Sequence, residues 1–216
     1  MPQRVKIVVV DDHPIVRAGV RAVLEIDTGL EVVGEASTSA EALERCGALR
    51  PAIAVVDWRL RGEDGGETVR ALISASPSTR AIMLSSYGGD EVIHRAFDAG
   101  ARGYLLKDTA PETLAKAINA VVAGRRYIPA EVAARLAAHG PRVALTGRET
   151  QVLALMADGL RNKEIAAALN MSEATARTHV QNILSKFDCT DRGRAIAVGI
   201  ARGFLSPETG GYAGAV

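Results

Sequence analysis

The stretch Ile7-Val8-Val9-Val10-Asp11-Asp12 decides the fold. Four β-branched residues follow one another without polar alternation and end in two aspartates. Such a strand is typical of a parallel sheet that helices cover on both faces. The run Ile53-Ala54-Val55-Val56-Asp57 repeats the pattern with one aspartate. Both runs therefore predict central strands whose carboxyl ends carry acidic side chains.

The first 124 residues alternate between short apolar runs and longer amphipathic ones. The runs predict strands at 6–10, 31–35, 52–56, 81–84 and 103–106, and helices near 14–26, 39–48, 66–75, 91–99 and 110–123. Thr38 with Glu41, and Thr109 with Glu112, are spaced as helix capping boxes, and Gly100 suits the position after a helix. Five strand–helix units predict an α/β doubly wound, five-stranded parallel sheet.

The second part of the chain has only helical signals. We expect a partly helical linker at 125–143, with its helix at Ala130–Ala138. Helices follow at 147–157, which Thr146 and Glu149 cap, then at 162–169, from Ser172 to about 187, and at 191–202. The sequence thus predicts an α/β domain at 1–124, a separate all-α four-helix domain at 144–206, and a flexible tail at 207–216.

Composition excludes several classes of protein. The chain has 216 residues and two cysteines, and the cysteines show no metal-ligand spacing, which argues against a zinc site or a disulfide framework. No 18-residue apolar run occurs, so we expect no membrane span and a cytoplasmic location. The net charge of +1 hides an asymmetry, because residues 1–124 hold 14 basic and 17 acidic side chains and residues 125–216 hold 12 and 8.

Four predicted strands end in side chains that suit phosphoryl chemistry. If the first and third strands are neighbours, Asp11, Asp12 and Asp57 lie together at the carboxyl edge of the sheet. Two like charges 4 Å apart repel by about 4 kcal/mol at an effective dielectric of 20, so this cluster needs either a cation or a raised pKa, and oxygen ligands suit Mg²⁺. Ser85 and Lys107 follow the fourth and fifth strands and face the same edge. A carboxylate nucleophile, a hard cation, a lysine and a hydroxyl make a phosphoryl-accepting site.

The motifs of the first domain resemble the receiver domain of a two-component response regulator. The resemblance rests on Val8–Pro14, on Asp57-Trp58-Arg59-Leu60 with Gly62 and Asp64-Gly65, on Ser85, and on Tyr104–Lys107. It implies a flavodoxin-like strand order of 2-1-3-4-5. One departure is Arg61, which stands where the family usually has proline, and we expect it to loosen the loop after Asp57.

Carried over to this sequence, the resemblance assigns a role to each residue of the site. Asp57 would be the phosphoacceptor and Tyr104 an aromatic switch that turns inward when Ser85 moves. Lys107 would pair with the phosphoryl oxygens and Ser85 would hydrogen-bond one of them. The Mg²⁺ ligands would be Asp11, Asp12, Asp57 and the backbone carbonyl of Arg59.

The helices after residue 144 resemble a LuxR-type helix-turn-helix domain. The resemblance rests on Leu145–Glu149, Asn162–Ala166, Ser172–Thr175 and His179–Lys186, with Ala176 in place of the family's common valine. It implies base contacts by Arg177, Thr178 and Gln181, and positions nearer the DNA phosphates for Lys163, Thr175 and Lys186. The last helix presents Ile196, Val198, Gly199 and Ile200, either as core of the domain or as a dimer contact.

These features together predict a NarL/FixJ-type response regulator. A sensor histidine kinase would phosphorylate Asp57, and the homodimer would bind double-stranded promoter DNA, with RNA polymerase as a further partner. The receiver would promote only its own phosphotransfer and dephosphorylation. Two alternatives stay open: a transcription factor whose receiver responds to a partner or ligand without phosphorylation, and a Mg²⁺-dependent aspartyl phosphohydrolase. The haloacid-dehalogenase-like enzymes of the latter class carry Asp-x-Asp on their first strand, whereas this chain has Asp-Asp there.

Overall fold

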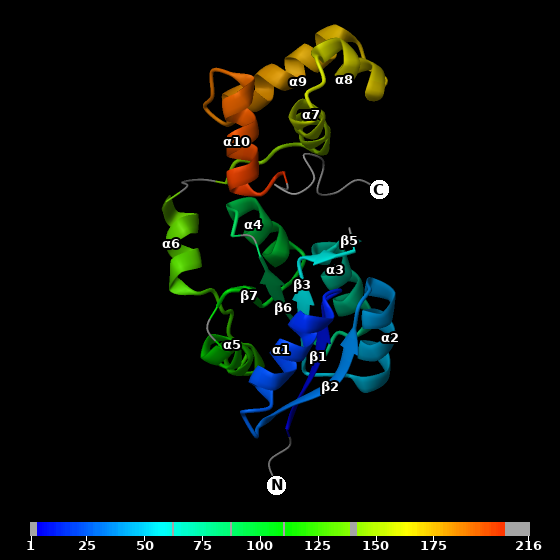
Figure 1. Ribbon diagram of the computed structural model, residues 1–216, viewed down its shortest axis with the longest axis vertical. Helices are drawn as coiled ribbons and strands as arrows, with labels where there is room; N and C mark the ends of the chain where they lie inside the picture. The colour runs from blue at the N-terminus through cyan, green and yellow to red at the C-terminus, as the bar shows by residue number, and fades with distance from the viewer. Residues whose placement is uncertain (1–3, 62, 87, 110, 139–141, 206–216) are drawn as a thin grey trace. The chain divides into compact units, whose positions relative to one another are not determined.

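The computed structural model describes residues 4–61, 63–86, 88–109, 111–138 and 142–205. The chain divides into two compact units (Figure 1). One unit comprises residues 1–88 and 93–135, and the other comprises residues 136–216 together with residues 89–92. Gly62, residues 139–141 of the predicted linker and the predicted tail at 207–216 lie outside the described residues.

The first unit is built on a five-stranded parallel sheet. The order is β2-β1-β3-β6-β7, formed by β1 (Val5–Val10), β2 (Leu30–Ala36), β3 (Ile53–Asp57), β6 (Arg80–Ser85) and β7 (Gly103–Leu106). This is the predicted order, with the fourth and fifth predicted strands numbered β6 and β7. Val10 of β1 pairs with Val56 of β3, so the two strands end side by side.

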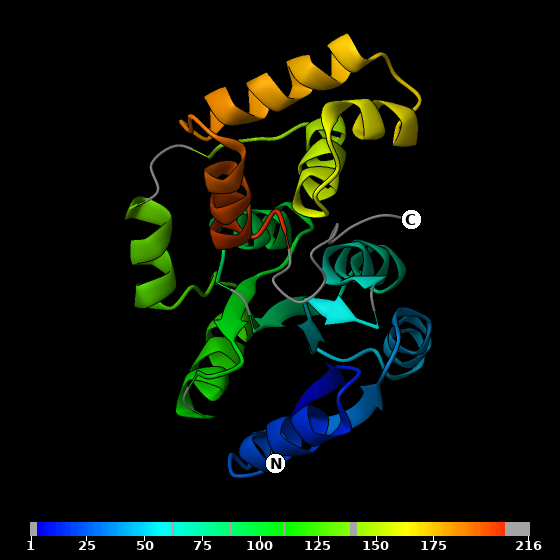
Figure 2. The ribbon, with the colours of Figure 1, turned by 45° about the horizontal axis from the view of Figure 1, so that its top comes forward.

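Helices cover both faces of the sheet (Figures 1 and 2). The elements α1 (Pro14–Leu24) and α5 (Pro111–Val122) lie on one face, over alternate residues such as Ile7 and Val9. Because strand side chains alternate, Val8 points to the opposite face, which α2 (Ser39–Leu49) and α3 (Gly65–Ala75) cover. Helix α4 (Asp90–Asp98) connects β6 to β7. The doubly wound architecture is confirmed.

Two local expectations for this unit need correction. The Thr38 hydroxyl accepts from the Glu41 N–H at 3.2 Å, but the Glu41 carboxylate accepts from Ser37 instead of closing the box. The Thr109 hydroxyl is buried without a hydrogen-bond partner, so it does not cap α5. Gly100 does occupy the position after α4, with φ of 101°.

A short hairpin follows β3 that the sequence reading did not predict. Strands β4 (Arg59–Leu60) and β5 (Glu63–Asp64) pair antiparallel, with Arg59 opposite Asp64. Arg61 stands at the turn with φ of 48°, in the left-handed region. The hairpin begins two residues after Asp57 and therefore shapes the edge of the sheet where the acidic side chains gather.

The segment after α5 begins on the sheet of the first unit. The Tyr127 N–H donates to the Arg102 carbonyl at 2.9 Å, and the Tyr127 carbonyl accepts from the Tyr104 N–H at 3.1 Å. These bonds extend the sheet beyond β7 by one bridge. Helix α6 (Ala130–Ala138) follows at the range predicted for it.

The second unit contains α7 (Gly147–Ala157), α8 (Asn162–Ala168), α9 (Glu173–Lys186) and α10 (Arg192–Arg202). The capping box of α7 is complete, because the Thr146 N–H donates to the Glu149 carboxylate at 2.7 Å and the Glu149 N–H donates to the Thr146 hydroxyl at 3.2 Å. Ala176, Ile183 and Phe187 of the α9 segment are buried in the core of this unit. No helix among the described residues has the length and apolar content needed to cross a membrane.

Candidate functional site

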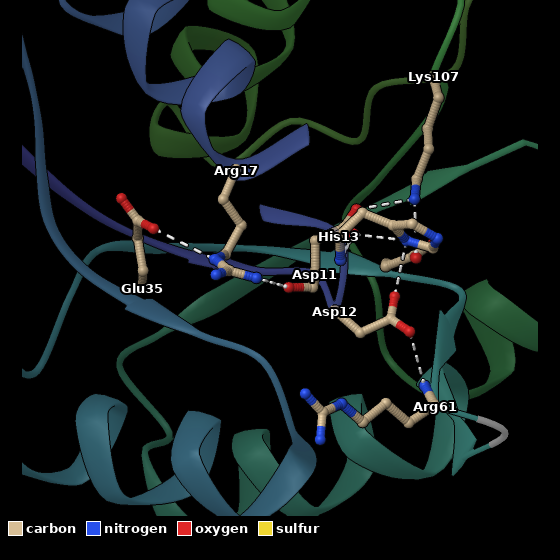
Figure 3. Close-up of polar contacts among 8 residues, drawn as sticks. Asp11, Asp12, His13, Arg17, Glu35, Arg61 and Lys107 are labelled. Atoms are coloured by element: carbon tan, nitrogen blue, oxygen red, sulfur yellow. Dashed lines mark hydrogen bonds and ion pairs between the residues drawn. The ribbon is translucent and has the colours of Figure 1, made fainter. Parts of the chain in front are cut away.

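Asp11, Asp12 and Asp57 meet at the carboxyl end of the sheet (Figure 3). One ligand atom from each of them, and one from His13, all lie within 4.8 Å of one another. The His13 Nδ1 is 2.8 Å from Asp12 Oδ1 and 3.2 Å from Asp11 Oδ1, a position to which the sequence reading gave no role. Asp11 and Asp57 are 1% and 4% exposed. The cluster is therefore a buried concentration of negative charge.

Lys107 lies between two of these carboxylates. Its Nζ is 2.7 Å from Asp57 Oδ2 and 2.7 Å from Asp11 Oδ2. The backbone places it there, because the Lys107 N–H donates to the Ser85 carbonyl at the end of β6, at 2.8 Å. The lysine thus brings one positive charge to the centre of the acidic cluster.

The electrostatics of the pair follow from burial. Burial raises the pKa of Asp57 and the Asp11 charge adds to the rise, while the hydrogen bond from Lys107 acts against it. Burial lowers the pKa of Lys107, but its hydrogen bonds and charge interactions with Asp11 and Asp57 outweigh burial, so that pKa is raised. Lys107 is therefore held in its protonated form beside carboxylates that need a cation.

The donor set fits a magnesium ion. Asp11 Oδ2 and Asp12 Oδ1 are buried and accept no well-directed hydrogen bond, although Lys107 Nζ lies 2.7 Å from the first and His13 Nδ1 lies 2.8 Å from the second. Buried carboxylate oxygens with free lone pairs are the ligands that Mg²⁺ prefers. The Arg59 backbone N–H donates to the Asp57 carboxylate; a role for the Arg59 carbonyl stays a prediction.

The segment after Asp57 is held against the site by close backbone packing. A Cβ on Gly65 would lie 2.3 Å from the Asp57 carbonyl oxygen and 2.8 Å from the Trp58 Cα, so only glycine fits there. Asp64 caps α3 by accepting from the Gly66 N–H at 2.8 Å, and its carboxylate also pairs with Arg95. Arg95 in turn lies over the Trp58 ring, 5.2 Å from its centroid.

Arg61 takes part in the same site through its backbone. Its N–H donates to Asp12 Oδ2 at 3.3 Å (Figure 3). From the sequence, arginine in place of proline was expected to loosen this loop. In the structure the residue ties the turn of the hairpin to the acidic cluster instead.

Arg17 supports the site from α1, and the sequence reading missed it. Its Nη1 donates to the Asp11 carbonyl at 2.6 Å, and its Nε lies 3.2 Å from the Glu35 carboxylate (Figure 3). Arg17 therefore connects the ends of β1 and β2. The available signal was the position of Arg17 in the first turn of α1, three residues after Pro14.

Ser85 and Tyr104 lie on the neighbouring strands β6 and β7, and both are fully buried. The side chain of Tyr104 is thus in an inward position. Ser85 ends β6 and its carbonyl is bonded to Lys107, so it stands at the same edge of the sheet as Asp57. The structure places Ser85 at the site and Tyr104 on the neighbouring strand, while the roles of both residues stay predictions.

The six residues predicted to contact DNA are all exposed, on α8 and α9: Lys163, Thr175, Arg177, Thr178, Gln181 and Lys186. Four of them also have partners within the unit, and one of these is Thr175, whose hydroxyl lies 2.8 Å from the Ser172 hydroxyl. Arg177 lies 3.6 Å from Glu173, and the Thr178 hydroxyl donates to the Ala174 carbonyl at 3.0 Å. Lys186 Nζ lies 2.6 Å from the Glu149 carboxylate, which gives it a structural role.

Some apolar residues of α10 belong to the core of the domain, and one is exposed and available for a dimer contact. Ile196 and Val198 pack against the core of the unit, and Gly199 is buried, with its Cβ position 2.9 Å from Leu153. Ile200 is 39% exposed. The helix therefore serves mainly as intradomain core and leaves Ile200 at the surface.

Comparison with known proteins assigns both parts of the chain. The family of response regulator receiver domains matches residues 7–119, and the luxR family of bacterial regulatory proteins matches residues 143–198. The chain is 40% identical over 199 residues to the DNA-binding transcriptional activator DevR/DosR of Mycobacterium tuberculosis, covering 88% of this chain and 92% of that one. It is 38% identical to the nitrate/nitrite response regulator protein NarP of Escherichia coli, over 87% of this chain and 90% of that one.

Solved structures give the same assignment. The response regulator ChrA of a heme-sensing two-component system is 34% identical with a TM-score of 0.55, and the match covers 94% of this chain and 99% of that one. A complex of the response regulator RcsB with DNA matches with 27% identity and a TM-score of 0.68, over 91% of this chain and 98% of RcsB. The chain therefore belongs to the NarL/FixJ-type two-component response regulators, transcriptional regulators that join a receiver domain to a LuxR-type DNA-binding domain.

Proposed function

We propose that Asp57 is the phosphoacceptor of this regulator and that a sensor histidine kinase is the phosphodonor. The observation that carries the proposal is the position of Lys107, whose Nζ lies 2.7 Å from both Asp57 and Asp11. An Asp57 oxygen attacks phosphorus, the bond from phosphorus to the kinase histidine nitrogen breaks, and an acyl phosphate forms. Lys107 balances the charge of the transferred group at the buried end of the sheet.

Asp11, Asp12 and Asp57 are the side chains that would hold Mg²⁺, with the Arg59 carbonyl as a further ligand. The ion supplies positive charge for the phosphoryl oxygens when it is bound. Asp11 Oδ2 and Asp12 Oδ1, which are buried and accept no well-directed hydrogen bond, support this assignment. Apart from phosphotransfer to itself and its own dephosphorylation, we assign no enzymatic activity to the chain.

The signal leaves the site through Ser85 and Tyr104. Ser85 hydrogen-bonds a phosphoryl oxygen and moves toward it, which stabilises Tyr104 in the inward position that it already has. The buried positions of both side chains, on adjacent strands, support this sequence of events. The change shifts a population between two receiver states.

Helix α9 is the element that reads the promoter. Arg177, Thr178 and Gln181 lie exposed on it and reach base edges in the major groove, as the second helix of a helix-turn-helix does. Lys163 and Thr175 contact phosphates. Lys186 contributes less, because it is paired with Glu149.

The active form is a homodimer that binds two half-sites. Helix α1 supports this proposal with an outward apolar face, since Ile15 is 85% exposed, Ala18, Gly19 and Ala22 follow it at helical spacing and are exposed, and Ile26 beyond the helix is 81% exposed. A contiguous apolar surface is a common sign of an interface. Ile200 of α10 offers a second contact. The partners are thus a second copy, promoter DNA, the kinase and, at the promoter, RNA polymerase, all met in the cytoplasm.

One experiment tests the phosphoacceptor assignment. Operator fragments are selected from genomic DNA with the full chain, with and without beryllofluoride, and affinity is measured on the selected site. We expect beryllofluoride to tighten binding at least about tenfold (~1.4 kcal/mol). Asp57→Asn should abolish that change, while the exposed neighbour Asp108→Asn should keep it.

The opposite result favours the alternative function. If beryllofluoride changes nothing in the wild-type protein, and Asp57→Asn binds DNA as the wild type does, the receiver works without phosphorylation. The acidic cluster with Lys107 argues against that alternative, because such a site has no evident use in a receiver that is never phosphorylated.

A further inference from the structure

A cavity of about 460 Å³ lies in the receiver, away from the acidic site. Strand β6 relates the two places, because Arg80 at its start lines the cavity and Ser85 at its end stands beside Asp57. Helix α3 and the segment between α4 and β7 supply the other walls. The cavity is therefore at the amino-terminal end of the parallel strands, opposite the phosphoacceptor.

The charge of this cavity has one sign. Its lining contains Arg70, Arg80 and Arg102 and no aspartate or glutamate. This contrasts with the receiver as a whole, which has 17 acidic against 14 basic side chains in residues 1–124. Among the residues that the structure describes, none of the three arginines forms an ion pair. All three arginines are exposed, so an anion in solution can reach them without displacing an ion-pair partner.

One of the arginines is already held in place. Arg80 Nη1 donates to the Val121 carbonyl at 2.8 Å and to the Val122 carbonyl at 2.7 Å, at the end of α5. These bonds hold the guanidinium group on the α5 face of the sheet, opposite α3, so Arg80 lines the cavity through the rest of the residue. The charges available to an anion in the cavity are therefore those of Arg70 and Arg102.

The remaining walls suit a ligand with an apolar part. Gly100 has φ of 101°, and a Cβ there would lie 2.8 Å from Ile73 Cδ1, so the backbone rests directly on that side chain. Ser74 is exposed one turn from Arg70 on α3 and offers a hydroxyl. The Thr79 hydroxyl is used internally, since it donates to the Pro51 carbonyl at 2.8 Å.

We propose that this cavity binds a small phosphate monoester. Arg70 and Arg102 contact the phosphate, which guanidinium groups bind through paired hydrogen bonds. Ile73 and Gly100 contact the organic part. The volume lies within the range of small-molecule sites, about 300–1,000 Å³. The site gives the receiver a metabolite input that is separate from phosphorylation of Asp57, so either proposal stands if the other fails.

Titration calorimetry on the full chain tests the proposal with three probes: adenosine monophosphate, adenosine and inorganic phosphate. We expect the nucleotide to bind and adenosine not to bind. The double variant Arg70→Gln with Arg102→Gln should weaken nucleotide binding at least about tenfold, and Ser74→Glu should do the same by repulsion. The matched control is Arg45→Gln with Lys116→Gln, which removes two exposed charges elsewhere on the receiver and should leave the affinity unchanged.

Amide chemical shifts locate the bound probe. The proposal requires shifts at Ser74, Gly100 and Arg102, and unfolding curves without ligand show whether each variant is folded. Inorganic phosphate binding as tightly as the nucleotide would support the site and identify free phosphate as its ligand. The proposal is overturned by no nucleotide binding at concentrations on the order of 10 mM, by equal losses in the control variant, or by shifts confined to Asp57 or α9.

Discussion

At the scale of single residues, Arg61 differs from the family's usual proline both in its backbone conformation and in the hydrogen bond that its N–H donates. Proline, the usual residue there, has φ of about −65° and no N–H. Arg61 has φ of 48° and uses its N–H to donate to Asp12 Oδ2. The hairpin turn of this chain is therefore a conformation that proline cannot adopt.

Substitution of Arg61 tests that inference. Arg61→Pro should lower the free energy of unfolding by about 1–3 kcal/mol, because it forces φ and removes the bond to Asp12. Arg61→Gly should be neutral or stabilise by up to about 1 kcal/mol, because glycine adopts positive φ without strain. Urea unfolding measures both, with Arg61→Ala as the control for loss of the charge. Equal stability of the proline and alanine variants would contradict the turn described here.

Single residues also mark where prediction from sequence succeeds. Asp11, Asp12, Asp57 and Lys107 were predicted to meet because parallel strands end at a shared edge, and the structure brings them together. The partner Arg17 was missed, since a contact between an arginine on α1 and the Asp11 carbonyl depends on side-chain conformation. Thr109 has capping-box spacing, yet its hydroxyl makes no bond, because spacing alone does not fix the backbone before a helix.

At the scale of elements, the start of α7 stabilises the DNA-binding domain. Glu149 is 3% exposed, closes the capping box with Thr146 and pairs with Lys186 of α9. Glu149→Gln keeps the shape but removes the charge, and we expect a loss of about 1–2 kcal/mol in the free energy of unfolding. Glu173→Gln, which removes an exposed carboxylate near Arg177, is the matched control and should cost less than about 0.5 kcal/mol.

The ion pair between Glu149 and Lys186 makes the free energy of unfolding depend on pH, and the direction of the Glu149 pKa shift gives the sign. Burial raises the pKa of Glu149, but the Lys186 and Thr146 hydrogen bonds outweigh burial, so the pKa is lowered from 4.5. A carboxylate whose pKa is lower in the folded state stabilises the fold at any pH above its pKa in the unfolded state. That stabilisation is lost as the pH falls through the pKa of the folded state. The stability difference between wild type and Glu149→Gln should therefore be full at neutral pH and shrink below about pH 4.5. A difference that grows on acidification would refute this.

The outward face of α1 gives a second test at this scale. A charge at the exposed Ile15 should oppose burial against a second copy, so Ile15→Glu should weaken the beryllofluoride-induced dimer at least about tenfold in sedimentation experiments. The stability of the monomer should stay the same because Ile15 is 85% exposed. Ile200→Glu is the matched variant on α10. Unchanged dimerisation in both variants would show that neither surface forms the interface.

The sequence resolves elements unevenly, for a physical reason. The long amphipathic helices and the buried strands repeat a period over several turns or pairs, and their order and approximate bounds were predicted correctly. The β4–β5 hairpin has two residues in each strand, too few for a period to appear, and its turn depends on contacts with Asp12. On α10, apolar spacing could not distinguish a core from an interface, and the packing of Ile196 and Val198 decides it.

At the scale of the whole molecule, the two halves of the chain carry opposite charge. Residues 1–124 have 14 basic and 17 acidic side chains, whereas residues 125–216 have 12 and 8. DNA binding by the basic half releases counterions from the phosphates, and the logarithm of the affinity falls with the logarithm of salt concentration by about 0.9 per phosphate contact. The near-neutral total therefore does not describe the surface that DNA meets.

Measuring the DNA affinity of the full chain at several salt concentrations should separate phosphate contacts from base contacts. Lys163→Gln removes a phosphate contact, so it should reduce the salt slope by about 0.9 and weaken binding to operator and random DNA alike. Gln181→Ala should leave the slope unchanged and reduce the preference for the operator by about 1–3 kcal/mol. Lys116→Gln removes the same charge from the receiver and should change neither quantity. A smaller slope in the Lys116 variant would mean that DNA also contacts the receiver, and the division of labour between the two halves would then be wrong.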